Sequence, residues 1–181
     1  MPPPPITSAD SSILCQACGL CCDGSLHQHV NLRGADVQAA LRLGLTVEDA
    51  GATSLFRQPC PLFQRNCCSA YLDRPRVCAN YKCGVLRAYQ SEEMTLEDGM
   101  AQVARARMLL EQVMTLMPPH STLAQVREDI GRWQSGLGMF GNETARTENQ
   151  RLFLIAGLLF MHMQQHFLRA REPMIPPGDG S

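Results

Sequence analysis

Residues 15–22 read Cys-Gln-Ala-Cys-Gly-Leu-Cys-Cys, and they hold four of the nine cysteines of this 181-residue chain. Spacings of two residues between cysteines let neighbouring thiolates converge on one ion, because a tight turn brings both sulfurs to the same side. The remaining cysteines are Cys60, Cys67, Cys68, Cys78 and Cys83. This pattern predicts that the chain binds a metal ion or a metal cluster.

Composition and charge are those of an ordinary globular protein. Hydrophobic residues make up 45% of the chain, and the formal net charge of -1 gives no overall attraction to nucleic acid or to a membrane surface. The longest apolar run, 152–161, is shorter than the roughly 20 residues that span a bilayer. The N-terminus lacks the basic and apolar regions of a secretory signal. We therefore expect a cytoplasmic protein with no membrane partner, and nucleic acid is not the expected ligand.

A disulfide framework is the alternative interpretation of so many cysteines. It requires an oxidising compartment and an even number of cysteines, and it disfavours adjacent cysteine pairs. The odd count, the two Cys-Cys pairs and the missing export signal all argue against it.

We expect a mainly α protein in which an irregular, loop-rich cysteine-cluster region packs on a small C-terminal helical bundle. The expected divisions are a disordered lead-in at 1–12, the cysteine region at 13–90, the bundle at 91–171 and a disordered tail at 172–181. The two terminal segments are rich in proline and small polar residues.

Apolar periodicity and capping signals predict four helices. One covers 35–43 and stops at Gly44. A second begins with a capping-box-like pair, Thr95 and Asp98, and ends at Pro118-Pro119. Its apolar face carries Val103, Ala106, Leu110, Val113 and Met117. The other two helices cover 122–134, with Leu123, Val126, Ile130 and Trp133 on one side, and 143–169, with Leu152, Ile155, Leu159, His162 and His166.

Eight thiolates suit two four-thiolate zinc sites, two cubane iron-sulfur clusters, or one cluster and one structural zinc. Fewer ligands with an open position would suit a catalytic ion. The run from Cys15 to Cys21, with a distant Cys60-Pro61, is similar to the bacterial ferredoxin pattern, although the ferredoxin spacing is not reproduced. Cys22 directly follows Cys21, so we expect it to face a different metal or to serve as a nucleophile. Either Cys67 or Cys68 can occupy a ligand position.

The surroundings of the second cysteine group allow several roles. Asp73 and Pro75 predict a helix start, which places Cys78 near a helix N-terminus that favours thiolate. Tyr71 either packs over the site or belongs to the core. Between residues 57 and 87 the sequence contains six basic residues and one acidic residue, Asp73. These could balance the charge of the thiolates or form a solvated basic face. The basic residues are Arg57, Arg65, Arg74, Arg76, Lys82 and Arg87.

Histidines offer weaker candidates. His27 and His29 follow the first cysteine group closely and could complete a mixed site. His162 and His166 are spaced i and i+4 on one helix, a spacing that binds metal but that more often belongs to a structural pair.

Three motifs occur in order: Cys-x2-Cys-x2-Cys-Cys from Cys15, Cys60-Pro61, and Cys-x2-Tyr-x2-Arg-Pro-x2-Cys from Cys68. Together, over about residues 13–88, they resemble the CxxCxxCC cysteine-cluster family of zinc- or iron-chelating proteins, the YkgJ type. Some of its relatives are linked to flagellin lysine N-methylation. Ala79 departs from the family, which often has arginine there. Tyr71 and Arg74 match family positions and are our candidates for cofactor contact. By this resemblance Cys67 is extra, and the ligand positions are Cys15, Cys18, Cys21, Cys22, Cys60, Cys68, Cys78 and Cys83.

Three functions are compatible with these residues. The first is a protein that binds an iron-sulfur cluster or zinc for electron transfer, metal handling or structural support. The second is a cluster-dependent protein-modifying enzyme resembling the lysine N-methylases, although the chain lacks a glycine-rich nucleotide loop. The third is a zinc-stabilised module that binds an unidentified protein partner. In each case chelation is expected to unfold 13–88 while much of the bundle helicity remains.

Overall fold

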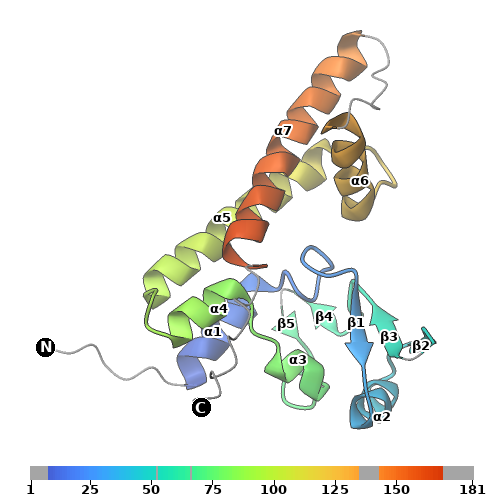
Figure 1. The fold of residues 1–181 in the computed structure, drawn as a ribbon, viewed down its shortest axis with the longest axis vertical. Helices are drawn as coiled ribbons and strands as arrows, with labels where there is room; N and C mark the ends of the chain where they lie inside the picture. The colour runs from blue at the N-terminus through green and yellow to red at the C-terminus, as the bar shows by residue number, and fades with distance from the viewer. Residues whose placement is uncertain (1–7, 52, 66, 135–142, 169–181) are drawn as a thin grey trace, which may run out of the picture.

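The computed structural model describes residues 8–51, 53–65, 67–134 and 143–168. The fold is mainly α-helical, as predicted, with a loop-rich cysteine region packed on a C-terminal helical bundle (Figure 1). The helices are α1 (Ser8–Cys18), α2 (Ala35–Arg42), α3 (Arg76–Asn80), α4 (Gly84–Gln90), α5 (Leu96–Leu116), α6 (Leu123–Gln134) and α7 (Glu143–His166). The strands are β1 (His29–Leu32), β2 (Glu48–Asp49), β3 (Ser54–Arg57), β4 (Phe63–Gln64) and β5 (Cys67–Cys68).

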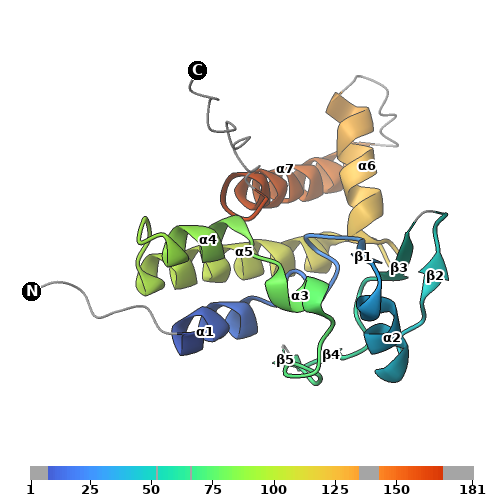
Figure 2. The same ribbon diagram turned by 60° about the horizontal axis from the view of Figure 1, so that its bottom comes forward.

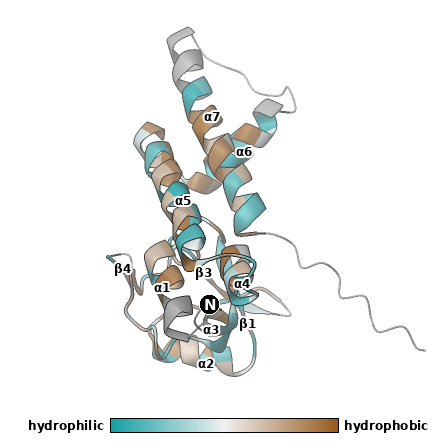
Figure 3. Ribbon diagram, turned by 90° about the vertical axis from the view of Figure 1, so that its left-hand side faces the viewer, coloured by the Kyte–Doolittle hydropathy of each residue, from teal (hydrophilic) through white to brown (hydrophobic). Residues whose placement is uncertain are grey.

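Helix α5 is the central element of the molecule. It packs antiparallel to α7 on one side and against α1 on the other, with α4 beside it (Figure 2). Figure 3 shows hydrophobic residues recurring between hydrophilic ones along α5, α6 and α7, as expected of amphipathic helices. One large hydrophobic core therefore joins the bundle to α1 and α4, which belong to the cysteine region.

Most residues of the predicted core faces of the bundle helices are buried, while Leu123, Ile155 and His166 are half-buried. Val103, Ala106, Leu110 and Val113 are buried along α5, and the flanking Met117 is partly buried. In α6 and α7 the buried positions include Val126, Ile130, Leu152, Leu159 and His162. The side chain of Trp133 lies outside the described part of the structure.

Both signals that delimit α5 act as predicted. The Thr95 hydroxyl accepts a hydrogen bond from the Asp98 backbone N–H at 3.0 Å, and the Asp98 carboxylate accepts one from the Thr95 N–H at 3.4 Å. These two bonds form a complete capping box. The helix ends at Leu116, ahead of the two prolines.

A second, much smaller core lies under a three-stranded antiparallel sheet of order β1-β3-β2. Its buried residues are Leu32 from β1, Phe56 from β3, Ala40 from α2 and Leu45. Helix α2 ends as predicted, since Gly44 follows it with a φ of 76° in the left-handed region that favours glycine. Strands β4 and β5 form a separate two-stranded sheet.

Some expectations from the sequence need correction. Helix α1 begins at Ser8, inside the segment 1–12 that we expected to be disordered, because Leu14 and Cys18 give it buried contacts with the large core. Helix α7 ends at His166 rather than at residue 169. The short strands were not predicted, because pairs of two to four residues leave too little alternation to detect. Residues 1–7 and the expected tail at 172–181 lie outside the described residues.

None of the helices in the described ranges combines the length and the apolarity that a membrane-spanning helix needs.

Candidate metal centre

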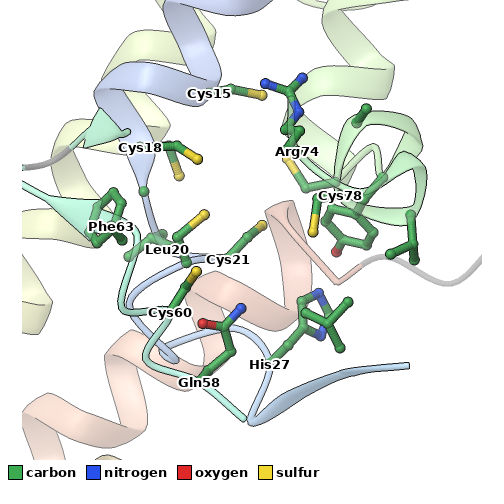
Figure 4. Close-up of a pocket in the computed structure, with 18 of the residues that line it drawn as sticks. Cys15, Cys18, Leu20, Cys21, His27, Gln58, Cys60, Phe63, Arg74 and Cys78 are labelled. Atoms are coloured by element: carbon green, nitrogen blue, oxygen red, sulfur yellow. The ribbon is translucent and has the colours of Figure 1, made fainter. Parts of the chain in front are cut away.

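A cavity of about 500 Å³ opens between α1, the loop that follows it, α3 and the strands β4 and β5 (Figure 4). Its walls carry all eight of the cysteines that the family resemblance indicates. They are Cys15, Cys18, Cys21, Cys22, Cys60, Cys68, Cys78 and Cys83. Cys67 is exposed on β5 and is not among the lining residues. All nine cysteines are free thiols.

The first cysteine group is positioned by the end of α1. Cys15 and Cys18 are three residues apart on this helix, so they lie on the same face. Gly19 ends the helix with a φ of 67°, and its N–H donates to the Cys15 carbonyl at 3.2 Å. The chain then turns back, with the Cys22 N–H donating to the Gly19 carbonyl at 2.8 Å. This turn brings Cys21 and Cys22 back toward the helix.

The bundle holds the loop after Cys22. The Asp23 carboxylate accepts a hydrogen bond from the Ser25 N–H at 2.8 Å and forms an ion pair with Arg107 of α5 at 2.9 Å. Arg127 of α6 donates to the Ser25 carbonyl at 3.1 Å, and its guanidinium lies 4.5 Å from the ring centroid of Phe160 of α7. All three bundle helices thus contribute to the position of the first cysteine group.

Replacing Asp23 or Arg107 by alanine is expected to destabilise the protein by about 1–2 kcal/mol, because each change leaves a partly buried partner without its charged hydrogen bond. Chemical denaturation of the single and double variants should give a coupling free energy of about 1 kcal/mol. Arg105→Ala is the matched control, since Arg105 is exposed on the same helix. A coupling near zero would show that this ion pair does not hold the loop.

Backbone hydrogen bonds position Cys60 and Cys68 of the second group beside Cys22 of the first. The Cys60 N–H donates to the Cys22 carbonyl at 2.8 Å, so the chain around Cys60 lies directly against the first loop. The Phe63 N–H donates to the Cys60 carbonyl at 2.9 Å, and Phe63 pairs with Cys68 in the β4–β5 sheet. This arrangement places Cys22, Cys60 and Cys68 in one part of the cavity wall.

Cys78 lies in α3 and Cys83 immediately precedes α4. The prediction that Asp73 caps the helix around Cys78 is wrong, because the helix begins at Arg76 with Pro75 as its N-cap residue and has no side-chain cap from its own segment. Instead, the carboxylate of Asp36 in α2 accepts a hydrogen bond from the Arg76 N–H at 2.6 Å. A residue 40 positions away makes this contact, so no local sequence signal could have revealed it.

Burial and mutual charge disfavour ionisation of the thiols. Burial raises the pKa of Cys18 to about 12, and the charge of Cys83 adds to the effect. Burial and the charge of Cys83 likewise raise the pKa values of Cys15 and Cys21. For Cys22 burial raises the pKa to about 12, and the charges of Cys68, Cys60, Cys78 and Asp23 add to the effect. The charge of Cys22 in turn helps to raise the pKa of Cys21. A bound cation would favour these thiolates by offsetting their negative charge.

Tyr71 and Arg74, our candidates for cofactor contact, both line the cavity. The Arg74 guanidinium lies 3.6 Å from the centroid of the Tyr71 ring and donates to the Tyr71 carbonyl at 3.0 Å. Its charge lowers the pKa values of Cys15 and Cys78, although burial outweighs this effect at both thiols. Arg74 is therefore the basic residue placed between the two cysteine groups.

Of the other basic residues singled out in the sequence, only Lys82 also lines the cavity. Arg57 forms an exposed ion pair with Glu48 at 2.9 Å, which is typical of a solvated surface. Arg87 donates to the Lys82 carbonyl. The charge of Arg87 also lowers the pKa of Cys83, although burial outweighs this effect.

The histidines divide into two kinds. His27 lines the cavity with its ring 4.9 Å from that of Tyr81 in an edge-on arrangement, and burial lowers its pKa. His29 also lines the cavity but is exposed. In the bundle, His162 Nε2 lies 3.0 Å from the Gln102 carbonyl of α5, and its ring centroid lies 4.6 Å from that of His166 with the rings tilted by 48°. These contacts favour the structural interpretation of the bundle pair.

The cavity wall contains buried polar atoms that have no hydrogen-bond partner. They are His27 Nε2, Gln58 Oε1 and Arg74 Nε. Within the described residues no three histidine, cysteine or carboxylate side chains are close enough together to hold one ion directly. The thiols instead surround a shared space, and its volume lies within the range of pockets that hold bound groups. Thiols together with unpartnered polar atoms fit a bound, charged inorganic group.

Comparison with known protein families gives one match. Residues 14–99 match the CxxCxxCC family, whose description is "Putative zinc- or iron-chelating domain". These residues form a CxxCxxCC domain. The domain begins in α1 and extends to the first turn of α5, so it contains all eight of the cysteines that line the cavity. No significant match was found among curated proteins or among solved structures.

The sequence missed several residues of the CxxCxxCC domain that shape the cavity. Gln58 and Tyr81 carried no signal, because a single glutamine or tyrosine has no characteristic spacing. Phe63 contacts the position of Gly19 across the cavity wall. Phe63 and Gly19 are far apart in the sequence, so only the folded structure reveals that they lie side by side.

Proposed function

We propose that the CxxCxxCC domain binds an iron-sulfur cofactor through the eight cysteines that line its cavity. The single observation that carries this proposal is the convergence of eight free thiols, from segments up to 68 residues apart, on one space of about 500 Å³. Disulfide-linked or inert buried cysteines have no reason to converge on one cavity.

The size of the cavity favours a cluster over bare zinc ions. A zinc ion with four thiolates has bonds of about 2.3 Å, so its sulfurs close directly around the ion. An iron-sulfur cluster contains inorganic sulfide as well as iron, so it fills a larger space between its four cysteine ligands than a zinc ion does. When bound, such a cluster supplies one-electron transfer, whereas zinc is redox-silent.

The residues around the thiols suit a negatively charged group. Arg74 lies beside thiols of both cysteine groups, and its Nε is buried without a partner. His27 Nε2 is likewise buried without a hydrogen-bond partner. Hydrogen bonds from such groups to sulfur atoms are one means by which a protein stabilises a cluster and adjusts its potential. Free thiols of this kind also fit the reducing cytoplasm, where we place the protein.

The test is the content of iron, zinc and acid-labile sulfide, with a visible spectrum, of the full chain purified without oxygen. We expect a brown protein with iron and sulfide in stoichiometric amounts. Cys18→Ser should lower bound metal at least twofold, and Cys67→Ser is the matched control that should retain it. Colourless protein with stoichiometric zinc and no sulfide would show that the domain binds zinc and not a cluster. Absence of any stoichiometric metal would reject the metal-centre function.

A further inference from the structure

The adjacent residues Cys21 and Cys22 belong to different surroundings. The side chain of Cys21 packs against the large core, as do those of Cys18 and Cys83. The backbone of Cys22 is instead hydrogen-bonded to Cys60 at 2.8 Å. Neighbouring cysteines in a tight turn cannot easily bind the same metal, so this pair marks a boundary between two parts of the cavity.

The two hydrophobic cores divide the cysteines in the same way. Cys18 is 9% exposed and is part of the large core, and Cys21 and Cys83 pack on that core. Cys60 and Cys78 pack on the small core formed by Leu32, Ala40, Leu45 and Phe56. Five cysteines are thus assigned by packing alone.

Chain geometry assigns the other three. Cys15 lies one helical turn from Cys18 on the same face of α1, and α1 packs against α4, which Cys83 precedes. Cys68 is paired with Phe63, three residues after Cys60. Cys22 is bonded to the backbone of Cys60.

We propose that the eight cysteines form two separate four-thiolate centres within one cavity. The first centre comprises Cys15, Cys18, Cys21 and Cys83, and the second comprises Cys22, Cys60, Cys68 and Cys78. This assignment rests on the proposed metal-binding function. Four thiolates are a full ligand set for a cubane cluster or for a structural zinc ion, so neither centre needs a ligand from the other.

The two centres differ in how firmly the protein supports them. The first is built on the large core that includes α5 and α7, whereas the second is attached to a core of only four buried residues. Metal loss from the second centre therefore requires less disruption of packing. Under stepwise chelation the second centre should release its metal before the first.

The test is thiol alkylation of the wild-type full chain during stepwise chelation, read by mass spectrometry at each cysteine. We expect Cys67 to react from the start, then Cys22, Cys60, Cys68 and Cys78 together, and the other four last. Simultaneous reaction of all eight, or release in mixed groups, would overturn the two-centre assignment. Reaction of all nine thiols before chelator is added would instead show that the metal-binding function itself has failed.

Double variants give an independent measurement. Cys18→Ser with Cys83→Ser changes one proposed centre, and Cys60→Ser with Cys78→Ser changes the other. Each pair should lower bound metal about twofold, while the cross pair Cys18→Ser with Cys60→Ser should lose nearly all of it. Equal losses from all three pairs would indicate one joint centre. Helical circular dichroism of each variant identifies any pair that fails to fold, and for such a pair the wild-type alkylation order decides.

Discussion

Removal of the bound metal is expected to unfold the small core around Phe56 while helices α5 and α7 stay folded. The small core has only four buried residues, and Cys60 and Cys78 pack against it. A core of that size cannot offset the conformational entropy of the strands and loops around it, so metal binding must contribute to its stability. The large core contains buried residues from α1, α4, α5, α6 and α7 and does not depend on the ligands to the same degree.

Hydrogen exchange with mass spectrometry measures this effect on the full chain. On chelation, amides in β1, α2 and β3 should lose protection by about 100-fold or more, which corresponds to local opening at roughly 3 kcal/mol lower cost. Amides in the middle of α5 and α7 should change little and serve as the internal control. Uniform loss of protection across the chain would contradict this result. It would show that the two cores unfold as one unit.

Among the eight glycines whose surroundings were compared, Gly19→Ala is expected to be the most damaging substitution. An added Cβ would clash with Phe63 Cζ and would lie 2.8 Å from Phe63 Cε2, so the ring would have to move. The backbone φ of 67° adds strain for any residue with a Cβ. Overpacking and strain together should destabilise the protein by about 2–5 kcal/mol. Because Gly19 sets the turn between Cys18 and Cys21, bound metal should also fall.

Gly44→Ala is the matched control for the backbone strain. Gly44 has a φ of 76°, yet nothing lies within 4 Å of the position of its added Cβ. Its substitution should therefore cost only about 1 kcal/mol. Denaturant unfolding of both variants measures the difference, and adding Phe63→Ala to Gly19→Ala should recover part of the loss. An equal loss of unfolding free energy in the two variants would mean that the Phe63 ring moves aside without destabilising the protein.

Local signals in the sequence predicted much of the fold. The capping box at Thr95, the stop at Gly44 and the apolar faces of the bundle helices depend on residues within a few positions of one another. For that reason each is visible in the sequence and is found in the structure. The start of α3 was predicted wrongly, because its capping contact comes from Asp36 in another helix. The expected cysteine region and bundle share one core. Leu14 and Leu20 of the cysteine region pack in it together with Val113 of α5 and Phe167, the residue after α7.

The sequence by itself determined that the chain carries a CxxCxxCC domain and which thiols are available, because cysteine spacing is a property of neighbouring residues. Only the tertiary structure decided which thiols lie together. Cys83 packs on the same core as Cys18 and Cys21, and the Cys60 N–H donates to the Cys22 carbonyl, against the order of the chain. Packing against two separate cores and hydrogen bonds between distant segments produce this arrangement, and neither is encoded in the spacing of cysteines.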